Sequence, residues 1–140
     1  MLSKRLAAVA AMVRQGSRVA DIGTDHAFLP VHLAESGITP SAIASDLRKG
    51  PCASAEKTVK AAGLADKIAV RLGDGLSSVL PDEVDDIVIA GMGGETVAAI
   101  LAAAPWVRDG RLRLILQPMS KIEVLHAFLL TGGFAIDREI

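Results

Sequence analysis

Hydrophobic residues along the chain follow two kinds of spacing, and the two kinds alternate. Over residues 2–13, Leu2, Leu6 and Val9 recur three or four positions apart, which is the spacing of an amphipathic helix, and Ser3 is placed to cap it. Short β-prone runs predict strands at residues 18–22, 42–45, 68–72, 86–90, 113–117 and 134–140. Between them, helical spacing predicts helices over 29–35, 51–62, 95–104 and 120–130, with a short helical stretch over 75–80.

Strands that alternate with helices through short loops predict an α/β fold. Right-handed crossovers then produce a doubly wound, mostly parallel sheet covered by helices on both faces. The near-continuous apolar strands agree with this prediction, because parallel strands are buried on both sides. No linker or low-complexity segment divides the chain, so we expect one domain over residues 1–140.

Composition narrows the class of protein. The 140 residues are 51% hydrophobic and 22% charged, which is typical of a globular domain. The single cysteine, Cys52, excludes an intrachain disulfide and a multi-cysteine metal site, and we expect no metal. No apolar run reaches the roughly 20 residues of a membrane span and the first residues lack a secretory signal, which favours the cytoplasm. A net charge of −1 gives no global attraction to nucleic acid, so any basic patch must be local.

Polar residues and glycines follow each of the first four predicted strands. In an open parallel sheet, ligands bind beyond the carboxyl ends of the strands, where the strand order reverses. The residues expected there are DIGTDH at 21–26, Asp46, GDG at 73–75 and GMGG at 91–94.

The turn after the first strand discriminates between cofactors. A dinucleotide needs G-x-G-x-x-G, but Thr24, Asp25 and His26 follow Gly23, and Asp25 would repel a pyrophosphate. Carboxylates at Asp21 and Asp25 suit the ammonium and sulfonium of S-adenosylmethionine instead.

Two further strand ends complete the predicted cofactor site. Asp46 is placed to accept both ribose hydroxyls, and Asp74 to accept the adenine amino group beside the amide of Gly75. Taken singly, each of these residues also fits a helix cap or a structural turn.

The fourth strand end bears on the substrate. Methyltransferases that act on exocyclic amines often carry an Asp/Asn-Pro-Pro-aromatic motif there, and GMGG at 91–94 offers neither the acid or amide nor the aromatic ring. A ring nitrogen, whose lone pair needs no deprotonation, is therefore the favoured target.

Five motifs carry a resemblance to a known family. They are LSKRL at 2–6, DIGTDHAFLP at 21–30, GDGL at 73–76, AGMGG at 90–94 and LQP at 116–118. With them the chain resembles the bacterial tRNA adenine-N1-methyltransferases that modify an adenine in the D-arm region. The resemblance implies a Rossmann-like class I methyltransferase domain that uses S-adenosylmethionine, acts on tRNA, and is followed by a helical C-terminal domain that helps to hold tRNA. Class I domains insert a seventh strand between strands five and six, so a chain that stops at Ile140 is expected to be C-terminally truncated, without that strand and without the helical domain.

Site residues are assigned from the strand ends and from the resemblance together. For the cofactor they are Asp21, Gly23, Thr24, Asp25, His26, Asp46, Leu47, Gly73, Asp74, Gly75, Ala90 and Gly91. For catalysis they are Asp25, which would stabilise the cationic product base, Gly91 and Met92. For the substrate they are Lys4, Arg5, Phe28 and Gln117.

Several roles stay open at this stage. His26 is a candidate base or a structural residue, and Phe28 either stacks on an extruded adenine or is buried against the sheet. Lys4, Arg5, Arg14 and Arg48 contact phosphates only if they lie on the cofactor face. The alternative functions are a small-molecule methyltransferase, a non-catalytic S-adenosylmethionine-binding module and, disfavoured by the first turn, a nicotinamide oxidoreductase. The oligomeric state and the tRNA species are not predicted.

Overall fold

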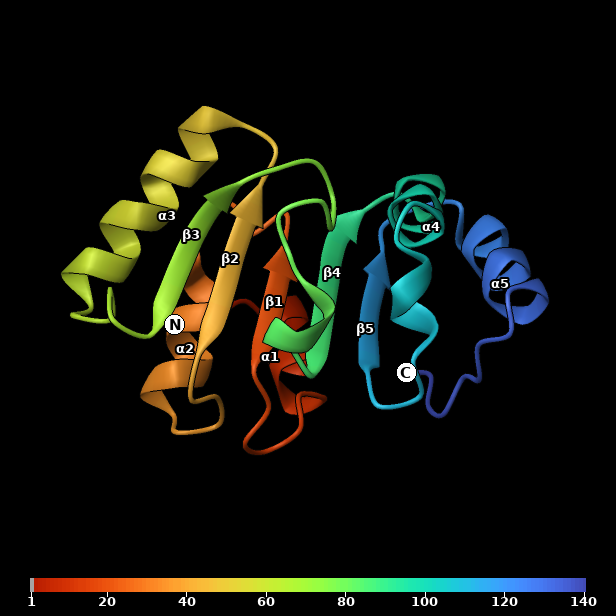
Figure 1. Ribbon diagram of the computed structural model, residues 1–140, viewed down its shortest axis with the longest axis horizontal. Coiled ribbons are helices and arrows are strands. Elements are labelled where there is room, and N and C mark those ends of the chain that lie inside the picture. Colours follow the sequence, from red (N-terminus) through yellow and green to blue (C-terminus); the bar gives the residue numbers. More distant parts are fainter. Residues whose placement is uncertain (1) are drawn as a thin grey trace.

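A parallel sheet forms the centre of the protein, shown in Figure 1 as a computed structural model that describes residues 2–140. Within these residues the sheet has five strands in the order β3-β2-β1-β4-β5, and every pairing is parallel. The strands are β1 (Val19–Ile22), β2 (Ala42–Asp46), β3 (Ile68–Leu72), β4 (Asp86–Met92) and β5 (Arg113–Pro118). This confirms the doubly wound α/β fold predicted from the alternating pattern.

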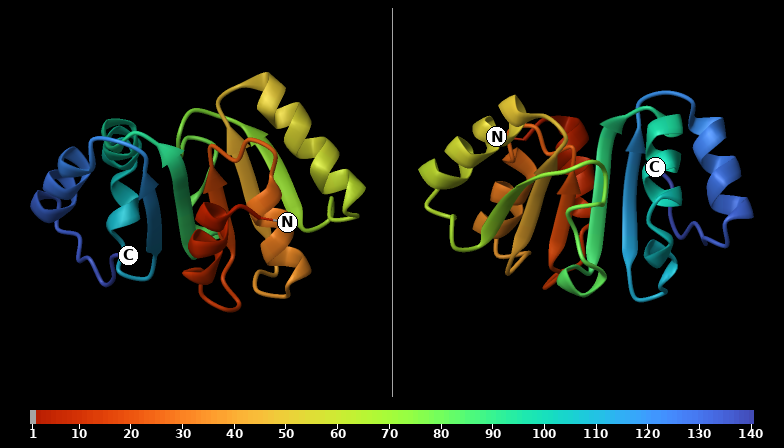
Figure 2. Two further views of the ribbon diagram at one scale, coloured as in Figure 1. Left: turned by 180° about the vertical axis from the view of Figure 1, so that it is seen from behind. Right: turned by 45° about the horizontal axis from the view of Figure 1, so that its top comes forward.

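Helices cover both faces of the sheet, because alternate strand residues point to opposite sides. Figure 2 shows α1 (Lys4–Ala11), α2 (Phe28–Glu35) and α3 (Lys49–Ala61) on one face. On the other face α4 (Gly94–Ala102) packs on β4 and β5, and α5 (Ile122–Thr131) packs against α4. In β4, Val88 faces the α1 and α2 side, whereas Ile87 and Ile89 face α4. None of the helices within residues 2–140 has the length and apolar character needed to cross a membrane.

An ion-pair network ties α1 to the amino edge of the sheet. Asp86, fully buried at the start of β4, accepts hydrogen bonds from the backbone N of Arg14 at 2.9 Å and from its Nε at 2.8 Å. Arg18 and Arg111 both bond the neighbouring Asp85, and the Arg18 bond is the main reason why the pKa of Asp85 falls to about 2. Burying a carboxylate is tolerated only where such partners replace water. Arg14 is therefore part of this network and lies away from the carboxyl edge.

The segment between β3 and β4 is not helical over residues 75–80, so that prediction is wrong. The chain there forms turns, and only Pro81–Glu83 make a short 3-10 helix. Arg71 causes this by bonding the carbonyl of Ser78 at 2.7 Å and both carboxylate oxygens of Glu83 at 2.8 and 2.9 Å. The Ser78 carbonyl thus bonds a side chain rather than the N–H of a following helical turn.

The predicted strand over residues 134–140 is also wrong. The ring of Phe134 lies 6.0 Å from that of Phe128, and the guanidinium carbon of Arg108 lies 5.3 Å from the Phe134 ring. These contacts hold the start of the segment against α5, and none of residues 134–140 pairs with β5 in the sheet. Figure 1 shows the chain end below α4. Because no strand lies beside residues 134–140, their backbone has no partner for sheet hydrogen bonds, even though the residues have a high β-propensity.

We expect Glu83→Gln to destabilise the protein in a pH-dependent way. The Arg71 bonds lower the pKa of Glu83 to about 2 from an ordinary 4.5, so its contribution is present above about pH 5 and is lost as the pH falls toward 2. Urea denaturation at neutral pH should show a loss of about 1 kcal/mol in the free energy of unfolding, and the difference from the wild type should shrink toward about pH 3.

The control for this experiment is Asp82→Asn. Asp82 is exposed and makes no ion pair among the described residues, so this variant should change the free energy of unfolding little at either pH. A loss for Glu83→Gln that is equal at both pH values would contradict the ion-pair explanation.

Candidate active site

The turns after the strands meet at the carboxyl edge of the sheet. In the register of the sheet Ile22 of β1 lies beside Ser45 of β2 and Ile89 of β4. The backbone N–H groups of Gly23 and Thr24 both donate to the Ser45 carbonyl, at 2.8 and 2.9 Å. This pairing brings the polar residues that follow β1 and β2 into one cluster.

Gly23 allows the first turn to press against the end of β4. Its φ is +74°, and a Cβ placed on it would lie 2.3 Å from the Met92 Cε, so no larger residue fits there without a shift. Two residues that are not glycine, Asp25 and Ala27, also adopt positive φ, of 57° and 60°. Such conformations persist only where the surroundings impose them, and they often mark functional turns.

Asp21 is a buried acid whose protonation is poised near neutrality. Only 5% of it is exposed, and its Oδ2 accepts a hydrogen bond of 2.8 Å from the Thr24 hydroxyl. Burial raises the pKa of Asp21 to about 7, although the Thr24 bond and the positive charge of Arg5 partly oppose the rise. A cation that approaches this carboxyl group would favour its ionised form.

Asp46 joins the first two turns. Its buried carboxylate accepts the backbone N of Asp25 at 3.2 Å and that of Arg48 at 3.1 Å. A carboxylate offers about four acceptor positions, so it retains capacity for ligand hydroxyls. The Arg48 side chain lies 3.4 Å from the same carboxylate, so its charge is directed at Asp46.

The turn after β3 reaches the same edge. The N–H of Gly73 donates to the Asp46 carbonyl at 2.9 Å, and the Asp74 that follows is exposed. Behind the turn the hydroxyl groups of Ser78 and Ser45 are hydrogen-bonded at 2.9 Å. The Cβ of Ser78 lies 2.7 Å from the position that a Cβ on residue 73 would take, so only glycine fits there without a shift. The sequence places Ser45 at a strand end but gives neither serine a role, because an isolated serine in a strand or loop carries no motif.

The end of β4 contains a bulge. The register with β5 shifts between Ala90 and Met92, and Gly91 takes a φ of +82°. Gln117 of β5 compensates, because its Oε1 accepts the N–H of Gly91 at 3.1 Å. The same oxygen accepts Arg5 Nη1 at 3.1 Å, which brings α1 over this strand end.

An aromatic pair stands beside the first turn. The rings of His26 and Phe28 stack 5.1 Å apart with 20° between their planes, and Phe28 is 52% exposed. Phe28 is therefore not buried against the sheet, and its exposed ring is free to stack on a base. The side chain of Asp25 is also exposed, and its Oδ2 lies 3.7 Å from Nε2 of His26.

Lys4 and Leu47 are less closely attached to this edge. Both are exposed, and neither side chain makes a hydrogen bond or ion pair with the rest of residues 2–140. Their predicted roles in binding substrate and cofactor stay predictions.

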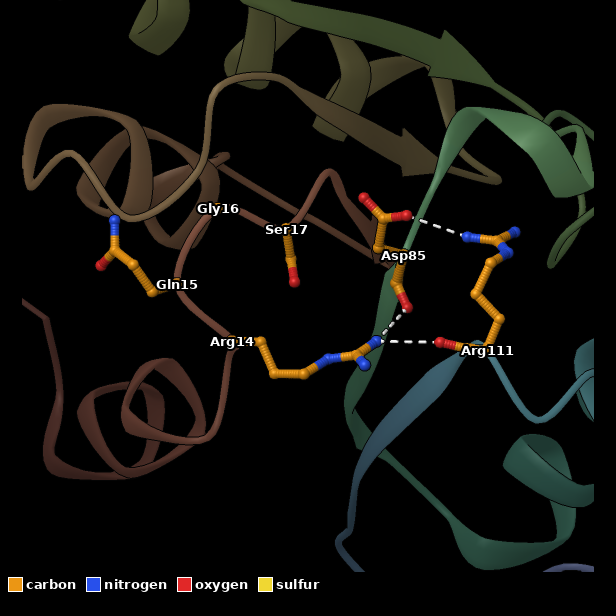
Figure 3. A pocket seen from close by; sticks show the side chains of 6 residues that line it. All are labelled: Arg14, Gln15, Gly16, Ser17, Asp85 and Arg111. Carbon is orange, nitrogen blue, oxygen red and sulfur yellow. Dashed lines mark hydrogen bonds and ion pairs between the residues drawn. The ribbon is translucent and has the colours of Figure 1, made fainter.

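Two hollows lie at the opposite, amino edge of the sheet. The smaller, of about 260 Å³, is lined by Arg14, Asp85 and Arg111 among others (Figure 3). Arg111 Nη1 donates to Asp85 Oδ1 at 2.9 Å, and Arg14 Nη2 donates to the backbone carbonyls of Asp85 at 2.9 Å and Arg111 at 3.2 Å. The larger, of about 570 Å³, lies beside the amino ends of β1, β2 and β3. Because the charges of the smaller hollow already satisfy one another, the carboxyl edge remains the better candidate site.

The carboxyl edge fits an adenosyl ligand with a cationic amino-acid end. Asp46 can accept ribose hydroxyls and Asp74 an adenine amino group, while Asp21 can face an ammonium group. At Gly23 and Gly73 a Cβ would meet the side chains of Met92 and Ser78 within 3.0 Å, so glycine lets both turns pack closely against their neighbours at this edge.

Comparisons with known proteins agree with this fit. A family model described as a methyltransferase domain matches residues 2–140. The tRNA (adenine(22)-N(1))-methyltransferase of Bacillus subtilis is 41% identical over 139 residues, which are 99% of this chain and 58% of that protein. The resemblance inferred from the five motifs is thereby confirmed.

Solved structures give the same result. Streptococcus pneumoniae Sp1610 in complex with S-adenosyl-L-methionine is 45% identical with a TM-score of 0.93, over 99% of this chain and 65% of that one. TrmK of M. capricolum in complex with S-adenosyl-homocysteine is 31% identical with a TM-score of 0.89, over 100% of this chain and 62% of that one. The chain thus spans less than two thirds of each of these relatives. With its parallel sheet, its strand-end carboxylates and a family match over residues 2–140, the chain belongs to the methyltransferase domain family.

Proposed function

We propose that the carboxyl edge binds S-adenosylmethionine and that the protein transfers its methyl group. The observation that carries this proposal is a pair of buried carboxylates, Asp21 and Asp46, near the ends of the adjacent strands β1 and β2. The turn that begins at Gly23 connects them, because its backbone bonds the end of β2 and the N–H of Asp25 donates to the Asp46 carboxylate. In this assignment Asp46 holds the ribose, Asp74 and the Gly75 amide hold the adenine, and Asp21 faces the amino-acid end. The two relatives solved with S-adenosyl ligands support the choice of cofactor.

We infer further that the methyl acceptor is N1 of an adenine in tRNA. The relative of known activity is named for this reaction. At the end of β4, Gly91 and Met92 supply no carboxylate or side-chain amide that would bind an exocyclic amine. The Gln117 oxygen nearby is already bonded to both Gly91 and Arg5. A ring nitrogen attacks with its own lone pair, so this site would need to supply positioning rather than a base.

Positioning and charge stabilisation are the roles we assign to the chain. Holding two reactants in line supplies roughly 7–11 kcal/mol of such a barrier. The exposed Phe28 ring, stacked on His26, offers a platform for an extruded base, and Asp25 beside it would stabilise the positive charge of the product base. Gly91 and Met92 would form the wall next to the transferred methyl group. A tRNA substrate also implies a cytoplasmic location, which stays a prediction.

One observation favours a small-molecule acceptor as the second candidate. Arg14, Arg18 and Arg111 are bonded to carboxylates at the amino edge, and the net charge is −1. These three arginines are therefore not available to neutralise RNA phosphates, which supply much of the affinity for nucleic acids.

Incubation with S-adenosylmethionine and an unmodified tRNA transcript tests the acceptor. The methylated nucleoside should be 1-methyladenosine, detected by mass spectrometry after digestion, in low yield because the helical domain that helps to hold tRNA is expected to be absent. Phe28→Ala should form less of it because the stacking platform is lost. Phe134→Ala is the matched control, since Phe134 packs against α5 away from the carboxyl edge. Methylation of a metabolite pool but not of tRNA would support the second candidate, and 6-methyladenosine would contradict the ring-nitrogen assignment.

Asp46→Ala should weaken binding of S-adenosylhomocysteine by more than about 1 kcal/mol, because two charge-assisted hydrogen bonds to the ribose would be lost. Calorimetry measures the affinity, and the thermal unfolding midpoint shows whether the fold survives. Asp66→Ala is the control, since Asp66 is an exposed acid at the other edge of the sheet, before β3. An unchanged affinity in a folded Asp46→Ala protein would limit Asp46 to joining the turns.

Cofactor affinity should rise with pH around neutrality. The pKa of Asp21 is about 7, so its carboxyl group is increasingly ionised as the pH rises. Only the ionised form attracts the ammonium group of the ligand. S-adenosylhomocysteine should therefore bind more tightly at about pH 8 than at about pH 6, and Asp21→Asn should remove the difference. 5′-Methylthioadenosine, which lacks the amino-acid end, should bind equally at both. If that ligand shows the same rise, a group other than Asp21 controls the binding.

A further inference from the structure

Arg5 differs from most other arginines of the protein in what it contacts. Five arginines form ion pairs with Asp or Glu; they are Arg14, Arg18, Arg48, Arg71 and Arg111. Arg5 has no carboxylate within 4.0 Å among the described residues, and its side chain bonds the neutral amide of Gln117. Its charge is therefore still available to an anion.

The position of Arg5 is fixed at the carboxyl edge. Its Nη1 lies 3.3 Å from where a Cβ on Gly91 would stand, so the guanidinium covers the bulge at the end of β4. The Gln117 oxygen holds that nitrogen and the Gly91 N–H together, both at 3.1 Å. Since Arg5 donates through one nitrogen, its other N–H groups remain for a ligand.

Arg5 also lies near the buried acid of the first turn. The positive charge of Arg5 lowers the pKa of Asp21 against the effect of burial, which places the two groups within electrostatic reach. In the register of the sheet Ile22 lies beside Ile89, so the turn after β1 and the bulge at Gly91 begin one residue apart. The carboxyl group of Asp21 in β1 and the guanidinium of Arg5, which lies over the end of β4, suit a ligand that carries both an ammonium and a carboxylate group.

We propose that Arg5 binds the α-carboxylate of the S-adenosyl ligand while Asp21 faces its ammonium group, and that Gln117 is a positioning residue for Arg5. This inference rests on the proposed cofactor. An oxyanion at Arg5 could also come from a phosphate of the target nucleotide. The carboxylate is favoured because Arg5 is held beside the buried Asp21, whereas the exposed base platform is formed by His26 and Phe28.

Two ligands that differ by one carboxylate test the proposal by calorimetry. S-adenosylmethionine and decarboxylated S-adenosylmethionine share the adenosine, the sulfonium and the amine. The wild-type chain should bind the first at least about tenfold more tightly, the loss expected when a charge-assisted pair is removed. Arg5→Gln should bind both with equal affinity, with its affinity for the decarboxylated ligand unchanged.

The control is Lys60→Gln, which removes an exposed charge in the last turn of α3 and should keep the wild-type preference. Gln117→Ala should reduce the preference for the carboxylated ligand, and in an Arg5→Gln background it should have no further effect on that ratio. A ratio that Gln117→Ala leaves at the wild-type value would contradict the positioning role.

Other outcomes overturn the inference. Equal weakening of both ligands by Arg5→Gln would show that Arg5 only supports the fold. Arg5→Gln could instead leave the preference for the carboxylated ligand unchanged and reduce the salt dependence of tRNA binding by the equivalent of about one phosphate contact. That result would assign Arg5 to the nucleic acid. If the wild-type chain binds neither ligand, the proposed cofactor fails together with this inference, whereas binding without preference overturns the inference alone.

Discussion

The parallel pairing of β1 with β2 on one side and β4 on the other is the constraint on which the candidate site depends. The chain moves outward from β1 through β2 to β3, then returns to β4, so the turns after β1 and β4 diverge at this point. Such a reversal is where open parallel sheets bind ligands. Here the two turns are pressed together, because Gly23 leaves room for Met92 and the Ser45 carbonyl holds the backbone of the first turn.

The two edges of the sheet use their charges differently. At the amino edge, arginines and aspartates satisfy one another, and the fully buried Asp86 ties the end of α1 to β4 through Arg14. At the carboxyl edge, Asp21 and Asp46 are bonded mainly to backbone N–H and hydroxyl groups, and Arg5 to an amide. Groups held by neutral partners keep the capacity to bind a charged ligand, which is why the opposite edge, although hollowed, is the poorer candidate.

Much of this arrangement follows from the sequence, because strand ends and their glycines are local features. The strand from Ile68 to Leu72 has the predicted bounds. Asp21 and Asp46 lie within the last two residues of β1 and β2, and Asp74 comes two residues after β3. What the sequence does not reveal depends on contacts between distant residues. Residues 134–140 have a strand-like pattern, but Phe134 packs on Phe128 and no strand lies beside them. The shared Gln117 oxygen joins α1, β4 and β5, and the Leu-Gln-Pro run in the sequence gives no sign of its two donors.

In the proposed complex an adenosyl ligand lies across the carboxyl ends of β1, β2 and β3. A crystal structure of the chain with S-adenosylhomocysteine tests it most directly. We predict that the ribose hydroxyls bond the Asp46 carboxylate and that the adenine lies beside Asp74 and Gly75. A ligand found instead in the hollow lined by Arg14 and Arg111, or one that leaves Asp46 bonded only to the backbone of Asp25 and Arg48, would contradict the claim.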